Sequence, residues 1–136
     1  MKIVQKSFSI STDKRNQMLD ITGKVQSAVT EAKIKNGHAL VFCPHTTAAI
    51  TINENADPSV IHDILLTLGE LIPHNRPGYR HGEGNSDSHV KSSLVGASEQ
   101  IIVADGSLGL GTWQGIFFCE FDGPRSRNFT VQISGE

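Results

Sequence analysis

Three polar clusters carry the residue types that metal binding and acid–base catalysis use. The first is His45-Thr46-Thr47, directly after an apolar stretch that is typical of a buried strand. The second covers residues 81–89 and reads His-Gly-Glu-Gly-Asn-Ser-Asp-Ser-His, and the third, residues 111–127, ends with two arginines. Residues 41–75 hold four acidic residues, three histidines and no lysine or arginine, which suits a cation better than a polyanion.

The second cluster can supply two ligands to one metal ion. In an extended chain, eight residues at about 3.3 Å each would separate His81 from His89 by about 26 Å, too far for a shared ion. Gly82 and Gly84 permit the bend that would bring these histidines together. With His45 they make a set of three, and three protein ligands with an open fourth position are typical of a catalytic zinc site. The sequence thus favours a divalent metal, zinc or another transition metal, because histidine suits these ions; magnesium, which prefers oxygen ligands, is the alternative.

Each of these residues also has a plainer interpretation. Most surface histidines are only solvated, and the spacing of His45, His81 and His89 is no strict motif of the HExxH kind. Arg125 and Arg127 can bind a phosphate through paired N–H donors, or they can simply keep a strand edge soluble. We expect plain solvation for three further histidines: His38, His62 and His74.

Four other polar or aromatic residues have two interpretations each. Glu120 alternates with core positions of an apolar strand, so it is either paired, for instance with an arginine, or functional. Ser92 and Ser93 can donate hydrogen bonds to an anion, although such residues are more often ordinary surface serines. Trp113 is expected in the core rather than as a platform for a ligand.

Length and composition exclude several classes of protein. The chain has 136 residues, the size of one ordinary domain. A net charge of −2 and 6% aromatic residues argue against nucleic acid as a partner. No apolar run reaches the roughly 18 residues of a membrane span, and the first residues lack the apolar stretch of a signal peptide. Cys43 and Cys119 are expected as buried free thiols in a reducing cytoplasm, so we expect a cytoplasmic protein.

The periodicity of apolar residues predicts the elements that position these clusters. Asp57 as N-cap and Pro58 in the first turn predict a helix that Pro73 ends. Residues 73–86, with two prolines and three glycines, predict a long loop, and a short helix capped by Ser86 or Asp87 follows and stops at Gly96. The fold class is therefore α+β, a single domain with a mainly antiparallel sheet and two main helices. The remaining elements are predicted at 4–11, 38–43, 48–53, 100–105, 112–121 and 128–134 as strands and at 22–35 as a helix.

Three segments of the chain resemble the YjbQ-like family, whose members are known as secondary thiamine-phosphate synthases: HTTAAITINENADPSV (45–60), HGEGNSDSHVKSSLVG (81–96) and GSLGLGTWQGIFFCEFDGPRSR (106–127). The resemblance extends over nearly the whole chain. It implies a homotrimer of small α+β subunits whose sheet curves towards a barrel. It also implies that His45, His81 and His89 are metal-associated. The other matching motif positions are Glu83, Asn85, Gln114, Glu120, Arg125 and Arg127.

The resemblance implies a reaction that joins a hydroxymethylpyrimidine diphosphate to a thiazole phosphate and releases pyrophosphate. A divalent cation and arginines would neutralise the charge that grows on the leaving diphosphate. We therefore expect the substrate to be a small phosphorylated molecule. The candidate residues are Arg125, Arg127 and Gln114 for binding its phosphates, and Glu83, Asn85 and Glu120 for catalysis.

Two other functions are compatible with the same residues. The first is a metal-dependent hydrolase of a small phosphorylated or carbonyl substrate, in which Glu83 or Glu120 would carry the proton. The second is a non-enzymatic trimeric module that binds a metal or a small anion.

Strands 112–121 and 128–134 are long and apolar and would need covering at a sheet edge. Together with the resemblance, this predicts a homotrimer.

Overall fold

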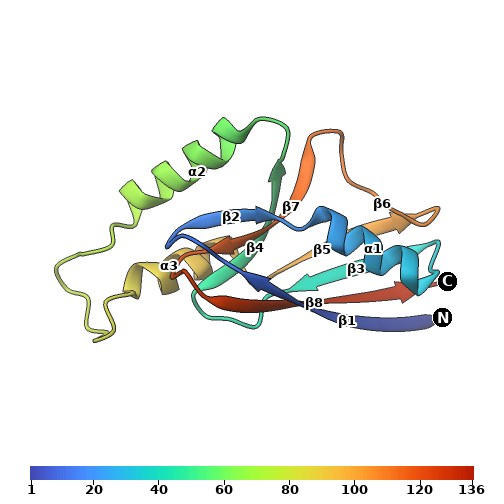
Figure 1. The fold of residues 1–136 in the computed structure, drawn as a ribbon, viewed down its shortest axis with the longest axis horizontal. Helices are drawn as coiled ribbons and strands as arrows, with labels where there is room; N and C mark the ends of the chain where they lie inside the picture. Colours follow the sequence, from blue (N-terminus) through green and yellow to red (C-terminus); the bar gives the residue numbers. More distant parts are fainter.

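Two antiparallel sheets and three helices make up the computed structural model, which describes all 136 residues (Figure 1). All neighbouring strands in both sheets run antiparallel. The first sheet has the strand order β1 (Lys2–Ser11), β8 (Ser126–Gly135), β3 (Gly37–Phe42), β5 (Ser98–Ala104) and β6 (Ser107–Leu108). The second has the order β2 (Gln17–Asp20), β7 (Gln114–Glu120) and β4 (Ala48–Glu54). The fold is a curled antiparallel half-barrel with helices, as the α+β prediction required.

The two sheets share one apolar core, and the second sheet also packs on its other face. Alternate residues of β7, Ile116 and Phe118, point into the main core with α1 (Thr22–Ala32) and the first sheet. The residues between them, Phe117 and Cys119, pack towards α2 (Pro58–Leu71) and the end of α3 (Ser86–Val95). Because β7 is buried on both faces, its sequence is a continuous apolar run rather than an alternation.

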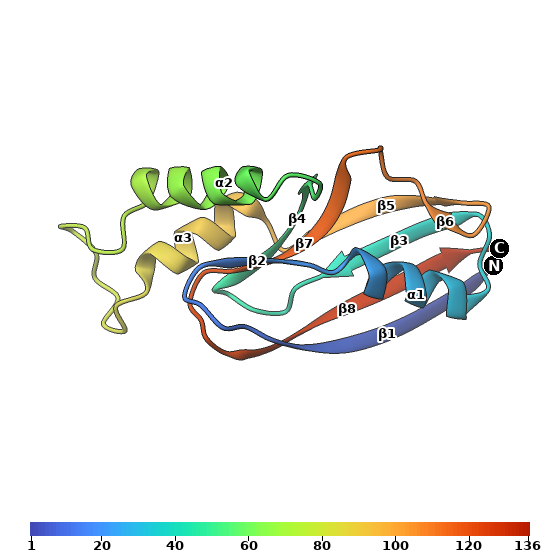
Figure 2. The same ribbon diagram turned by 45° about the horizontal axis from the view of Figure 1, so that its top comes forward.

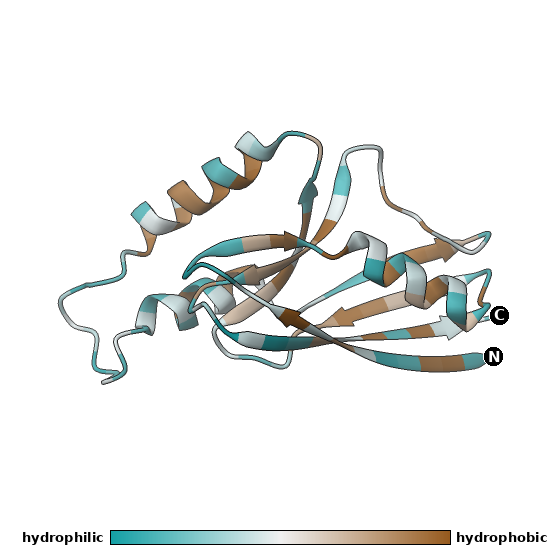
Figure 3. Cartoon of the chain, viewed as in Figure 1, coloured by the Kyte–Doolittle hydropathy of each residue, from teal (hydrophilic) through white to brown (hydrophobic).

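The helices α2 and α3 lie at one end of the molecule, opposite the two termini (Figures 1 and 2). The Asp57 side chain accepts a hydrogen bond from the Ser59 N–H at 2.9 Å, and Pro73 follows the last turn of α2, as predicted. Figure 3 shows apolar residues along α2, but none of them is fully buried, and Leu71 is 73% exposed. None of the three helices combines the length and apolarity of a membrane-spanning helix.

Several sequence predictions are corrected by the structure. Helix α1 ends in a left-handed Lys33 (φ 57°), before the expected end at residue 35. Trp113 is 62% exposed because it lies in a turn and strand β7 begins one residue later. The two long apolar strands are not edges: β7 lies between β2 and β4, and β8 between β1 and β3. The edge argument for a homotrimer therefore does not hold.

Both cysteines are free and buried in the core, as the sequence predicts. Burial raises the pKa of Cys43, and burial next to Cys43 raises the pKa of Cys119 to about 12. Burial therefore favours the protonated form of both thiols.

Candidate functional site

The loop before α3 brings His81 and His89 together. Gly84 adopts a positive φ of 72°, which turns the chain back as the sequence predicts. The two imidazole rings are perpendicular, with an interplanar angle of 89° and ring centres 5.2 Å apart. Two imidazoles bound to one tetrahedral zinc ion have ring centres roughly 5 Å apart, given zinc–nitrogen distances of about 2.0–2.1 Å. The pair therefore has the spacing of two ligands of one ion.

His45 lies in the connection between β3 and β4, with its ring against Phe118 at 6.4 Å. Its Nε2 is 3.1 Å from the Asn128 carbonyl and 3.0 Å from the Asn128 N–H. Nε2 can either accept from the Asn128 N–H, with the proton on Nδ1, or donate to the carbonyl, and only the second tautomer leaves the Nδ1 lone pair for a metal. Burial lowers the pKa of His45, and the charge of Arg127 lowers it further. The ring is therefore neutral near pH 7, as a metal ligand must be.

A groove of about 500 Å³ separates His45 from His89, and both side chains line it. Nowhere in the chain do three or more histidine, cysteine or carboxylate side chains converge closely enough to hold an ion. The structure thus pairs His81 with His89 and places the third expected ligand, His45, beside the same groove as His89. The expected convergence of His45, His81 and His89 on one ion is therefore not present in this structure.

Beneath His45, Glu120 and Arg127 form a buried ion pair. Arg127 donates from Nε and Nη2 to the two carboxylate oxygens, and its Nη2 also donates to the Thr47 hydroxyl at 2.8 Å. Thr12 donates to the same carboxylate at 2.8 Å. Burial alone would raise the pKa of Glu120, but the hydrogen bonds from Arg127, the Asp122 N–H and Thr12 outweigh it and lower the pKa. This pair holds the segment next to His45 and engages Nε and Nη2 of Arg127, whereas its Nη1 has no hydrogen-bond partner within the chain.

Arg125 does not pair with Glu120 but with Asp122, at 2.9 Å, and its side chain is half-exposed. Asp122 also accepts a hydrogen bond from Nδ2 of Asn85 at 2.7 Å. Asn85 is the N-cap residue of α3, where the sequence predicted Ser86 or Asp87. The expected phosphate ligand Arg125 and the expected catalytic Asn85 therefore converge on one carboxylate.

The two other expected site residues lie apart from this network. Glu83 is exposed, and its carboxylate is 3.8 Å from Nε2 of His81. Gln114 accepts a hydrogen bond from the Gly111 N–H at 2.8 Å. It begins β7, whereas Glu120 ends that strand, so six residues of extended chain separate them by about 20 Å. Within one chain, Gln114 is therefore not part of the histidine site.

The sequence analysis did not identify a second buried ion network, which anchors α3. Asp87 is fully buried and accepts two hydrogen bonds from Arg15 at 2.9 Å and one from Lys91 at 3.1 Å. Burial would raise the pKa of Asp87, but these two cations outweigh it and lower the pKa. The i,i+4 spacing of Asp87 and Lys91, two residues on either side of His89, was the available signal. The network fixes the helix that carries His89.

Two buried polar atoms of the structure have no hydrogen-bond partner, and both belong to the α3 region: Oδ1 of Asn85 and Oγ of Ser92. Asn85 precedes His89 by four residues and Ser92 follows it by three, so all three share one helix face. Buried polar atoms are rarely left unpaired in folded proteins. This face is therefore where a ligand is expected.

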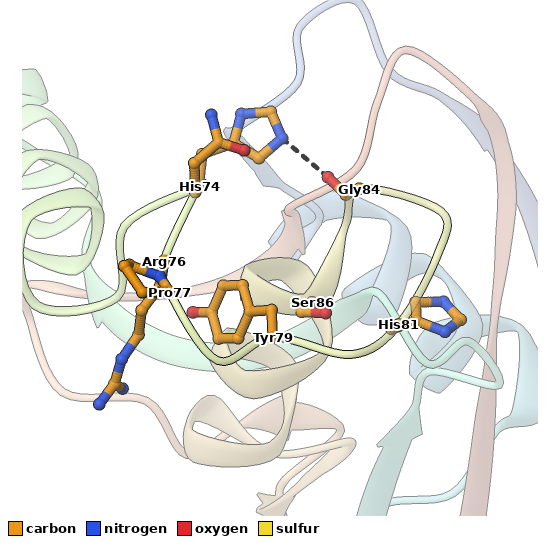
Figure 4. A pocket seen from close by; sticks show the side chains of 8 residues that line it. His74, Arg76, Pro77, Tyr79, His81, Gly84 and Ser86 are labelled. Atoms are coloured by element: carbon orange, nitrogen blue, oxygen red, sulfur yellow. Dashed lines mark hydrogen bonds between the residues drawn. The ribbon is translucent and has the colours of Figure 1, made fainter.

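The loop between α2 and α3 is held in shape by its own hydrogen bonds (Figure 4). Nε2 of His74 is 2.8 Å from the Gly84 carbonyl, and the Tyr79 hydroxyl donates to the Pro73 carbonyl at 3.3 Å. These residues line a cavity of about 330 Å³ that His81 also borders. His74 is exposed as predicted, but it braces the loop instead of being only solvated. His81 thus borders this cavity and is also next to His89.

A single α+β domain with a histidine pair beside a polar groove is the class of protein that this geometry defines. The chain belongs to the family described as UPF0047 protein YjbQ-like, whose model matches residues 6–136. It is 59% identical to the UPF0047 protein MJ1081 of Methanocaldococcus jannaschii, over 95% of this chain and 93% of that protein. It is 53% identical to YugU of Bacillus subtilis, over 96% and 98%.

Crystal structures of relatives have the same fold. A YjbQ/UPF0047 family protein from Clostridium acetobutylicum superposes with a TM-score of 0.93 at 53% identity, over 95% of this chain and 99% of that one. A YjbQ-like protein of Sulfolobus solfataricus gives a TM-score of 0.95 at 37% identity, over 99% of both chains.

Proposed function

We propose that the chain is a metal-dependent enzyme that acts on a small phosphorylated molecule, with zinc held by His45, His81 and His89. The observation that carries this proposal is the perpendicular His81–His89 pair, 5.2 Å between ring centres, beside the groove that His45 also lines. The unpartnered Oγ of Ser92, a residue that lines this groove, supports a ligand at the same place.

The chain's own residues would orient the ligands and move the proton. A bound zinc ion supplies Lewis acidity towards a phosphoryl oxygen and lowers the pKa of a coordinated water. The Asn128 carbonyl orients His45, and the ion pair beneath it keeps the Thr47 segment in place. Glu83, exposed and near His81, is the carboxylate that can carry a proton at the site.

Arg125 and Arg127 are both paired with carboxylates of the chain, which favours hydrolysis of the phosphorylated substrate over a reaction that releases diphosphate. Departure of a diphosphate needs several positive charges, but Arg127 is buried against Glu120 and Arg125 is bound to Asp122. Hydrolysis needs one substrate and an open metal position, and the histidine groove offers room for both.

The condensation that forms thiamine phosphate is the second candidate, and one observation favours it. A synthase must hold two organic substrates, and each histidine of the pair borders a cavity of its own. The loop cavity of about 330 Å³ is bordered by His81, and the groove of about 500 Å³ is bordered by His89. Two substrates entering from the two sides would meet at the metal.

Metal analysis combined with a substrate panel tests the proposal. Purified protein would be loaded with zinc and incubated with phosphorylated metabolites, singly and in pairs. We expect one zinc ion per chain and activity in the wild type, and loss of both in His89→Ala. His62→Ala is the matched control, because His62 is exposed on α2 and pairs only with Asp63. Full activity in protein shown to be metal-free would refute the proposal.

A further inference from the structure

We propose that Ser92 binds an anionic oxygen of the substrate, in the groove between α3 and the connection from β3 to β4. This inference rests on the proposed function for the phosphoryl class of that ligand. Ser92 lies three positions beyond His89 on α3, and its contact with this oxygen would help to determine which substrate the site accepts.

One face of α3 forms a wall of the groove. His89, Ser92, Ser93 and Gly96 are spaced by three, four and seven residues, so they share one side of the helix, and all of them line the groove. The opposite wall includes His45 and Thr46, and the groove has no carboxylate, lysine or arginine in its lining. A negatively charged oxygen that enters it meets hydroxyls and imidazoles and is not repelled by a carboxylate.

The two neighbouring serines differ in what their hydroxyls do. Ser93 donates to the His89 carbonyl at 3.0 Å, the usual i−4 hydrogen bond of a helical serine. Ser92 is 8% exposed, and its buried Oγ has no partner. Serine has three staggered rotamers, so rotation about Cα–Cβ can redirect this hydroxyl, and Ser92 already lines the groove.

An unpaired buried hydroxyl costs stability, so its presence beside the histidines calls for a ligand that completes it. The nearby cation cannot do so, because the Lys91 ammonium is bound to Asp87 and Asn16. With the imidazoles at one end and the Ser92 hydroxyl as donor, the groove fits an oxyanion. The proposed function makes this oxyanion a phosphoryl group rather than a carboxylate.

The test compares Ser92→Ala with Ser93→Ala in zinc-loaded protein, with inorganic phosphate and acetate as probes in calorimetric titrations. We expect Ser92→Ala to weaken phosphate binding roughly tenfold, the effect of one hydrogen bond to a charged group. Ser93→Ala should stay within about twofold, since its hydroxyl is already engaged. Ser92→Thr, which keeps the hydroxyl, should restore binding. The melting temperature of Ser92→Ala should be equal to or above that of the wild type, the opposite of what a structural hydrogen bond would give.

Each result has a defined meaning. Equal phosphate affinity in Ser92→Ala and wild type, or no phosphate binding by the wild type, would overturn the inference. Loss of acetate binding alone would overturn the phosphoryl assignment. If the wild type binds no zinc, the proposed function fails, and the same comparison of the two serine variants in metal-free protein still decides the role of Ser92.

Discussion

Replacing Arg127 with alanine isolates the buried ion pair beneath His45. Glu120 is fully buried, and the substitution removes both guanidinium hydrogen bonds to its carboxylate while leaving the Thr12 hydroxyl and one backbone N–H. The same change frees the Thr47 hydroxyl from its 2.8 Å contact. A buried carboxylate without its cation is strongly unfavourable.

The expected loss of unfolding free energy is about 3–5 kcal/mol, the effect of breaking one partner of a buried ion pair. An entropy of unfolding near 2.1 cal/mol/K per residue gives about 0.29 kcal/mol/K for this chain, so about 3 kcal/mol lowers the melting temperature by about 10 °C. Thermal and urea unfolding followed by circular dichroism measure this loss.

Arg125→Ala is the matched control, since it removes an ion pair of the same type whose guanidinium is half-exposed. Such a surface pair contributes about 0–1 kcal/mol, so this variant should melt within a few degrees of the wild type. If Arg127→Ala lost no more stability than Arg125→Ala, Arg127 would not be a structural cation. Arg127 would then return as a candidate for binding the substrate phosphate.

Three further outcomes are expected. The pKa values of Asp87 and Glu120 are lowered by their cations, so these carboxylates take up protons in the unfolded chain before they do in the folded one as the pH falls. The unfolding free energy should therefore decline below about pH 5 and continue to fall through the folded pKa values. An unfolding free energy that stays constant down to about pH 3 would contradict this. Asp57→Ala removes the N-cap of α2 and should lower the midpoint of urea unfolding, whereas an unchanged midpoint would show that the cap does not contribute. On the family resemblance we expect a homotrimer, and sedimentation equilibrium that returns the monomer mass of 14.7 kDa at micromolar concentration would rule it out.

Local sequence signals predicted most of the elements but not the neighbours of the strands. The Asp57–Pro58 start and the Pro73 end of α2 are set by chemistry within a few residues, and so is the stop of α3 at Gly96. Strand β2 has only four residues and too little alternation to recognise. The position of β8 between β1 and β3 depends on pairing across the whole chain, which no local pattern contains.

In the candidate site, too, the local features could be predicted from the sequence and the long-range contacts could not. The return of the chain between His81 and His89 followed from the glycines between them, because Gly84 supplies the positive φ that the turn needs. The partners of the arginines could not be predicted, since Arg15 and Asp87 are 72 residues apart in sequence. The missing partner of the Ser92 hydroxyl is likewise a property of packing.

An anomalous difference map, from crystals grown with zinc and measured on both sides of the zinc absorption edge, tests the proposed metal site most directly. We expect one peak per chain in the groove beside α3, with nitrogens of His45, His81 and His89 about 2.0–2.1 Å from it. Crystals of His89→Ala grown in the same way should lose the peak. A fully loaded crystal without a peak at these imidazoles, or with zinc bound elsewhere only, would contradict the proposed site.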